Sequence, residues 1–214
     1  MPDGCVEQRN SRSFGLYVPS VALVVLVFFC NFMARLILPP FLVPLEKEFA
    51  LSHGQAGGLL LIMSLGISVS LLLSGLVSTW LTHRRTIALS SLGVGLSLHL
   101  LPHAHSLLEL HAFCILMGLA VGLYLPSGVS TITSLLPPRH WGKGLAMHEM
   151  APNLSFILAP AVAAAAEGVF TWREVFAGLG TCSLIIGLGF AVWGRGGDFS
   201  GQAPRPAVIA AILR

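Results

Sequence analysis

The sequence contains few charged residues. Only 10% of its 214 residues are Asp, Glu, Lys or Arg, whereas 55% are hydrophobic and the mean hydropathy is +0.82. A soluble domain normally carries about a quarter charged residues. So small a share cannot cover a surface that faces water, but it suits a surface that faces lipid. The composition therefore indicates an integral membrane protein whose surroundings are the lipid bilayer.

The sequence also lacks the patterns of several common sites. Its 4 cysteines are scattered without a CxxC pair, so we expect packing residues and no disulfide frame. The basic residues form no patch with interleaved aromatics, which gives no support to nucleic-acid binding. The first apolar run is too long for a cleavable signal peptide. No acid or cysteine completes a ligand set with the histidines of one predicted hairpin, so we expect no metal and no cofactor: His99, His103, His105 and His111.

Long apolar runs are abundant instead. A helix needs about 20 apolar residues to cross the hydrocarbon core of a bilayer. Short links with breakers or charges separate the runs, at residues 46–48, 83–85, 102–105, 137–140 and 171–174. The pattern predicts an all-α, multi-pass membrane domain over residues 16–193 with six transmembrane helices, at residues 16–41, 54–80, 86–101, 107–136, 143–166 and 174–193.

The basic residues predict the orientation of these helices. Cytoplasmic loops of membrane proteins carry an excess of Lys and Arg. With the N-terminus in the cytoplasm, only Lys47 and Arg173 lie outside, and Arg35 lies within the first span. All the others lie inside: Arg9, Arg12, Arg84, Arg85, Arg139, Lys143, Arg195, Arg205 and Arg214. We therefore expect a cytoplasmic N-terminus in a plasma membrane, with a bacterial inner membrane as the expected location.

The two ends of the chain are predicted to lie outside the six-helix domain. Residues 1–15 are interpreted as a cytoplasmic tail. Residues 194–214 begin with Gly, Arg and Asp and are interpreted as a flexible linker. The apolar run 206–213 is too short to span a bilayer, and we interpret it as the start of a seventh helix that is cut off.

The link between the second and third spans carries a family resemblance. It keeps a leading Gly75, an aliphatic Val77 and the basic pair Arg84-Arg85. This pattern resembles the cytoplasmic motif G-x-L-x-D-R-x-G-R-R of the major facilitator superfamily of transporters. The sequence departs from the motif where Thr79, Trp80 and Thr82 replace Asp, Arg and Gly. In the family that Asp helps to lock the two halves of the transporter, so the usual lock is not expected here.

Three further stretches resemble the same family. The fifth span keeps Pro160 of a motif resembling G-x8-G-x3-G-P-x2-G-G, with small residues in place of every glycine. The fourth span places Tyr124 and Ser127 after two glycines, as in the family's cavity-lining fourth helix, but Cys114 stands where antiporters often have Arg. Trp172-Arg173 begins a W-R-x-x-F turn. The chain thus resembles the N-terminal six-helix half of such a transporter, which implies two inverted repeats of three helices.

The resemblance implies transport of a small solute, with a second six-helix half as partner. Substrate would bind between the halves, so a lone half has one wall of the cavity. The second half is expected either as a covalent continuation or as a second copy in a homodimer. A non-transporting scaffold or sensor remains the alternative. A rhomboid-type protease is disfavoured because Ser127 follows proline and the last span has no histidine, so no enzymatic activity is expected.

Two groups of polar residues lie at membrane depth, where a charge is costly. Arg35 and Asn31 are one helical turn apart on the first span, and the guanidinium either binds a small anion in the cavity or extends to the lipid headgroups. On the fifth span His148 and Glu149 are candidates for proton coupling, with Asn153 one turn further. Glu149 alternatively pairs with Lys143 or Arg139. The substrate-binding candidates are therefore Asn31, Arg35, Tyr124, Ser127 and Asn153.

Overall fold

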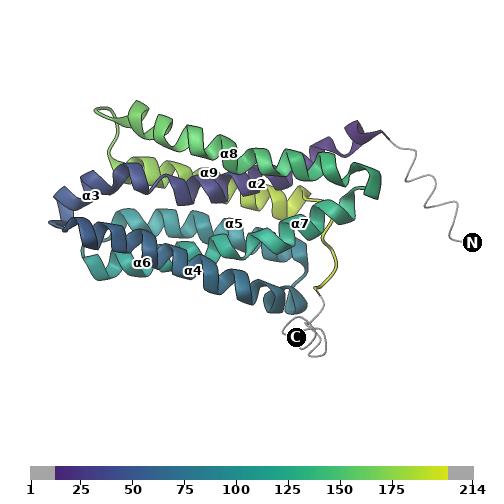
Figure 1. Ribbon diagram of the computed structural model, residues 1–214, viewed down its shortest axis with the longest axis horizontal. Coiled ribbons are helices and arrows are strands. Elements are labelled where there is room, and N and C mark those ends of the chain that lie inside the picture. Colours follow the sequence, from purple (N-terminus) through teal and green to yellow (C-terminus); the bar gives the residue numbers. More distant parts are fainter. Residues whose placement is uncertain (1–12, 202–214) are drawn as a thin grey trace, which may run out of the picture.

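The computed structural model describes residues 13–201, and this part of the chain is almost entirely helical (Figure 1). Four short 3-10 turns connect or extend the α-helices, at Phe14–Leu16, Pro39–Phe41, Leu101–His103 and Pro138–His140. The α-helices are α2 (Val18–Leu36), α3 (Leu42–Phe49), α4 (His53–Trp80), α5 (His83–Leu100), α6 (Leu107–Gly122), α7 (Tyr124–Leu135), α8 (Trp141–Ala166) and α9 (Trp172–Trp193).

The long helices lie side by side along one axis and form a bundle with two distinct ends (Figure 1). One end, here called the terminal end, holds the start of the described chain, the α4–α5 turn and residues 194–201. The opposite end, here called the distal end, holds α3, the α5–α6 connection and the α8–α9 turn. The predicted seventh-helix start at 206–213 and most of the predicted N-terminal tail lie outside the described residues.

The helices agree with the predicted spans to within a few residues, and the all-helical membrane fold is confirmed in this coarse form. Five helical stretches are long and apolar enough to cross a membrane, at residues 18–49, 53–80, 107–135, 138–166 and 172–193. The third predicted span is α5, which is 18 residues long and less apolar. Because α5 is largely buried among the other helices, it needs fewer apolar residues than a helix that faces lipid. A count of six spans therefore stays a prediction.

Two features differ from the predicted pattern. The first predicted span does not end in a tight turn at residues 46–48, because the chain bends at Pro39 and continues as α3 through these residues. The fourth predicted span is divided at Leu123 into α6 and α7. Proline lacks the backbone N–H that a helix interior requires, which explains the break near Pro39. The division at Leu123 lies three residues before Pro126, so the missing N–H of this proline explains it in the same way.

Small residues allow the helices to approach closely. The most extensive packing joins α4 with α6, α5 with α9 and α2 with α8. A Cβ atom at Gly118 of α6 would lie 2.2 Å from the Met63 carbonyl oxygen of α4, and one at Gly122 would lie 2.5 Å from that of Ile67. Between α5 and α9, a Cβ atom at Gly95 would lie 2.9 Å from the carbonyl oxygen of Gly180. Glycine is therefore required at these contacts, as is common where membrane helices pack.

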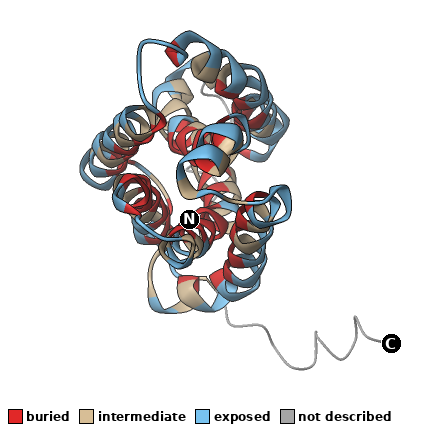
Figure 2. Cartoon of the chain, turned by 90° about the vertical axis from the view of Figure 1, so that its left-hand side faces the viewer, coloured by how far each residue is buried: buried red, intermediate tan, exposed pale blue. Residues whose placement is uncertain are grey.

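The buried residues lie between the helices, and the exposed ones cover the outside of the bundle (Figure 2). Much of that outside is apolar: Leu72 of α4 is 82% exposed and Ile157 of α8 is 68% exposed. In water such a surface would be unstable, but in a bilayer it is the surface that contacts lipid or another apolar protein.

Candidate functional site

A hydrogen-bonded chain of polar groups crosses the centre of the bundle. Asn31 of α2 is buried, and its Nδ2 donates to Ser90 Oγ of α5 over 2.9 Å. The Ser90 hydroxyl in turn donates to the Ala120 carbonyl oxygen of α6 over 2.7 Å. The Oδ1 atom of Asn31 is buried and has no hydrogen-bond partner in the described part of the chain. Asn31 therefore ties three helices together and keeps one acceptor unused, which is costly in an apolar interior.

An aromatic stack lies next to this chain. The rings of Phe28 and His148 are parallel to within 10° with centroids 3.9 Å apart, and Tyr124 stacks on the other two rings. Tyr124 is fully buried and donates its hydroxyl to the Val24 carbonyl oxygen over 2.9 Å. The stack joins α2, α7 and α8, so two predicted functional residues, Tyr124 and His148, lie together in the core.

The predicted proton-coupling pair is in contact. His148 Nδ1 lies 3.0 Å from Glu149 Oε1, while Nε2 is buried and has no hydrogen-bond partner among the residues that the structure describes. The His148 side chain is fully buried, but that of Glu149 is 60% exposed. Asn153 is exposed on the same helix and donates its Nδ2 to the Glu149 carbonyl oxygen over 2.7 Å. Among the described residues Glu149 makes no ion pair with Lys143.

Arg35 is half-buried in α2 and has no ion pair or hydrogen bond with any residue between 13 and 201. Its guanidinium lies over the Phe32 ring, whose centroid is 5.9 Å from Cζ. A guanidinium offers five donors in a planar fork that suits a carboxylate or phosphate. All of these donors are available on Arg35 within the described part of the chain.

Ser127 has a partner that the sequence pattern did not indicate. His83, the first residue of α5, is buried, and its Nδ1 lies 3.1 Å from Ser127 Oγ of α7. No carboxylate contacts His83 in the part of the chain that the structure describes. The pair is a buried contact between helices 44 residues apart, so no local signal in the sequence points to it.

The predicted gating-loop residues have different surroundings. Gly75 lies in α4, and a Cβ atom there would meet open space. Arg84 donates from Nη2 to the carbonyl oxygens of Ala191 and Val192, over 2.9 and 3.2 Å, at the C-terminal end of α9. Arg85 is exposed. Arg84 thus satisfies carbonyl groups that a helix end leaves free and places its charge at the negative end of the helix dipole.

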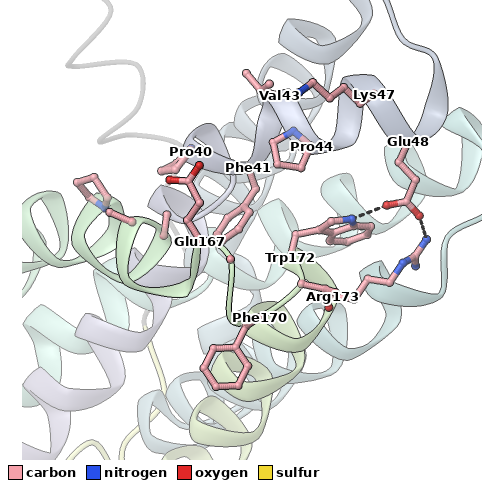
Figure 3. A pocket seen from close by; sticks show the side chains of 15 residues that line it. Pro40, Phe41, Val43, Pro44, Lys47, Glu48, Glu167, Phe170, Trp172 and Arg173 are labelled. Carbon is pink, nitrogen blue, oxygen red and sulfur yellow. Dashed lines mark hydrogen bonds and ion pairs between the residues drawn. The ribbon is translucent and has the colours of Figure 1, made fainter.

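The distal end carries an open groove with a volume of about 1010 Å³, between α3 and the α8–α9 turn (Figure 3). Trp172 and Arg173 both bond to Glu48 beside it, and the Trp172 Nε1 donates to Glu48 Oε2 over 2.6 Å. Arg173 also donates to the carbonyl oxygen of Pro102. Glu167 and Phe170 line the groove from the α8–α9 turn. The sequence places Glu48 in the short link 46–48, and no local pattern points to its partners, which lie 124 and 125 residues away.

The family model of the Major Facilitator Superfamily matches residues 24–211. The chain belongs to the major facilitator superfamily. The predicted family is therefore confirmed, and it is a family of transporters rather than enzymes. No curated protein matches the sequence.

Solved structures of major facilitator proteins share the fold. A bacterial homolog of the human lysosomal transporter Spinster matches with a TM-score of 0.77 and 18% identity, over 94% of this chain and 48% of that one. A D-xylose–proton symporter matches with a TM-score of 0.73 and 16% identity, over 92% and 51%. A peptide transporter in complex with sulfate matches with a TM-score of 0.72 and 18% identity, over 97% of this chain and 46% of that one. The chain thus spans about half the length of these structures.

Proposed function

We propose that this chain is the N-terminal half of a secondary transporter in which a second six-helix half completes the substrate cavity. The match to the superfamily carries this proposal, together with the half-length coverage of the solved transporters. The second half is supplied by a continuation of the chain or by a second copy. The exposed apolar faces of α4 and α8 are surfaces on which such a half would pack.

The packing pairs support an inverted repeat of three helices within the half. With α6 and α7 taken together as the fourth span, the extensive contacts join spans one and five, two and four, and three and six. Exchange of spans one, two and three with four, five and six leaves this set of pairs unchanged, as a two-fold relation requires. α5 then counts as the third of six spans. From the bias of Lys and Arg among the predicted loops we further propose that the N-terminus lies on the cytoplasmic side, with a bacterial inner membrane as the proposed location.

The proposed substrate is a small anion or weak organic acid that binds to Arg35. Arg35 lies in the helical stretch 18–49, which is long and apolar enough to cross a membrane. Its guanidinium has no counter-ion among the described residues, and a bidentate anion would satisfy its donors. Asn31 Oδ1, one turn before Arg35, is an unused acceptor for a hydroxyl or amide of the same substrate. Asn153 offers a polar side chain on the exposed face of α8.

We assign different roles to the other predicted site residues. The hydroxyls of Tyr124 and Ser127 already have partners within the bundle, so we propose that these residues support the cavity wall. His148 and Glu149 form the proposed proton-coupling pair, since Glu149 is exposed and the buried imidazole beside it has an unused nitrogen. Gly75, Arg84 and Arg85 form the proposed gating loop at the terminal end.

Thermal unfolding of the purified full chain in detergent tests the proposed substrate class. Acetate, succinate and inorganic phosphate would each be added at increasing concentration. A bound ligand at 100 times its Kd stabilises a folded protein by about 2.7 kcal/mol. We expect one of these anions to raise the Tm of the wild type, a smaller effect in Arg35→Lys and none in Arg35→Gln. If an anion raised the Tm of the wild type and of Arg35→Gln equally, Arg35 would not be part of the anion-binding site.

A further inference from the structure

The segment that follows α9 does not leave the bundle freely. Residues 194–201, here called the strap, pass from the end of α9 to the end of α4, beside α7 (Figure 1). Three backbone hydrogen bonds hold the strap: His83 N to Phe199 O over 3.1 Å, Arg84 N to Gly197 O over 2.9 Å and Gly201 N to Ser78 O over 2.7 Å. Thr82 and Ser200 form an antiparallel bridge within this contact. The strap is therefore paired with the α4–α5 turn as a short strand would be.

Side chains add to this pairing. The Phe199 ring packs edge-on against His83 with centroids 4.8 Å apart. Asp198 Oδ1 lies 3.4 Å from Arg84 Nη1, and Arg84 also bonds the last carbonyl groups of α9. One arginine thus joins α5, the end of α9 and the strap. This ion pair is the one carboxylate contact of Arg84 among the described residues.

The strap covers a group of buried polar residues at the terminal end. A Cβ atom at Gly197 would lie 2.5 Å from Thr131 Oγ1, and one at Gly201 would lie 2.2 Å from Ser78 Oγ. Thr131 is fully buried, and its hydroxyl has no hydrogen-bond partner among residues 13–201. His83, whose ring packs against Phe199 of the strap, also contacts Ser127. The strap thus contacts Ser78, His83 and Thr131 directly, and the fourth polar residue, Ser127, through His83.

Most residues of the strap are not buried. The Asp198 side chain is 66% exposed, and Phe199 is 43% exposed. Gly196 and Gly197 have φ values of +80° and +73°, which a non-glycine residue adopts only with strain. Segments held by a few exposed backbone hydrogen bonds open at a lower free energy than the core.

We propose that residues 194–201 act as a closing strap over the polar group of Ser78, His83, Ser127 and Thr131, and that this end of the bundle opens when the strap unpairs from the α4–α5 turn. Opening would admit water to these four side chains while the helices stay folded. The strap is inferred from these contacts alone and does not depend on the proposed substrate or on transport.

Hydrogen–deuterium exchange of the full chain in lipid nanodiscs tests the proposal. Gly197→Ala introduces both the strained φ and the contact with Thr131. We expect amide exchange in peptides spanning residues 78–86 and 194–201 to rise together by about tenfold or more, since strain of this kind changes a local equilibrium by that order. Exchange at the distal end, in peptides spanning residues 166–176, stays unchanged. The matched control is Gly142→Ala, where a Cβ atom meets open space at the same end.

Two further variants test the proposal even if Gly197→Ala folds poorly. Asp198→Asn removes only the charge and is expected to raise exchange in both peptides by about twofold, the effect of an exposed ion pair. In Thr82→Cys/Ser200→Cys the two bridge residues are close enough for a disulfide, and oxidation should slow exchange in both peptides. The proposal is overturned if residues 194–201 exchange as a free chain in the wild type, or if the disulfide leaves exchange of residues 78–86 unchanged.

Discussion

The Trp172 indole donates a hydrogen bond to Glu48 across 2.6 Å and 124 residues of sequence. The Arg173 guanidinium stacks over the same indole, with Cζ 4.5 Å from the ring centroid, and bonds both Glu48 and the Pro102 carbonyl oxygen. Three segments at the distal end, namely α3, the α5–α6 link and the start of α9, are therefore joined by three side chains.

Replacement of the Trp172 indole tests the contribution of these contacts to stability. Trp172→Phe keeps an aromatic ring but removes the donor to Glu48, and a hydrogen bond to a charged group contributes about 1.5–3 kcal/mol. We expect Tm to fall in thermal unfolding by a matching amount. Trp193→Phe is the control, because Trp193 is 75% exposed and makes no hydrogen bond within residues 13–201. Equal Tm values for the two variants would mean that the bond to Glu48 contributes nothing.

The α4–α6 contact should not tolerate a methyl group at Gly118. Gly118→Ala places a Cβ atom 2.2 Å from the Met63 carbonyl oxygen, so the two helices must separate. Overpacking of this kind costs about 1–3 kcal/mol. Gly178→Ala in α9 is the matched control, since a Cβ atom there meets open space and alanine favours a helix. In chemical unfolding in mixed micelles, the free energy of unfolding of Gly118→Ala should be lower than that of the wild type. That of Gly178→Ala should equal or exceed the wild-type value.

Two reciprocal hydrogen bonds join α5 and α9. Ser91 Oγ donates to the Ser183 carbonyl oxygen and Ser183 Oγ donates to that of Ser91, both over 3.0 Å. Such bonds between membrane helices contribute about 0.6 kcal/mol on average. We expect Ser91→Ala and Ser183→Ala each to lower the free energy of unfolding by that order and the double variant to show their sum. Ser68→Ala serves as control, because its hydroxyl bonds only within α4. A double variant as stable as the wild type would contradict this.

Tyr124 is assigned to the cavity wall and not to the substrate. Tyr124→Phe keeps the stack with Phe28 and His148 but loses the bond to Val24, so we expect a loss of about 0.5–1.5 kcal/mol in stability. The Tm increase expected from the anion proposed to bind at Arg35 should stay the same. If Tyr124→Phe abolished the anion-dependent increase in Tm without lowering the stability of the ligand-free protein, Tyr124 would belong to the substrate site.

The sequence alone determined that this chain is a helical membrane protein, where its helices lie and which family it resembles. These properties depend on apolar run length, breakers and short motifs, all of which are local. Where apolar runs and breakers did not decide the local structure, the predicted helix or turn was wrong or stayed a prediction. Glu48 belongs to a helix and not to a turn, since the chain bends earlier at Pro39. The low hydropathy of α5 is explained only by its burial.

The tertiary structure decided which polar residues meet. Asn31 with Ser90, His83 with Ser127 and Glu48 with Trp172 are pairs separated by 59, 44 and 124 residues. In a bilayer interior a polar side chain must find a partner, but the sequence does not say which helix supplies it. Helix packing decides that, because close approach at residues such as Gly118 fixes the rotation of each helix and thereby the direction of every side chain on it.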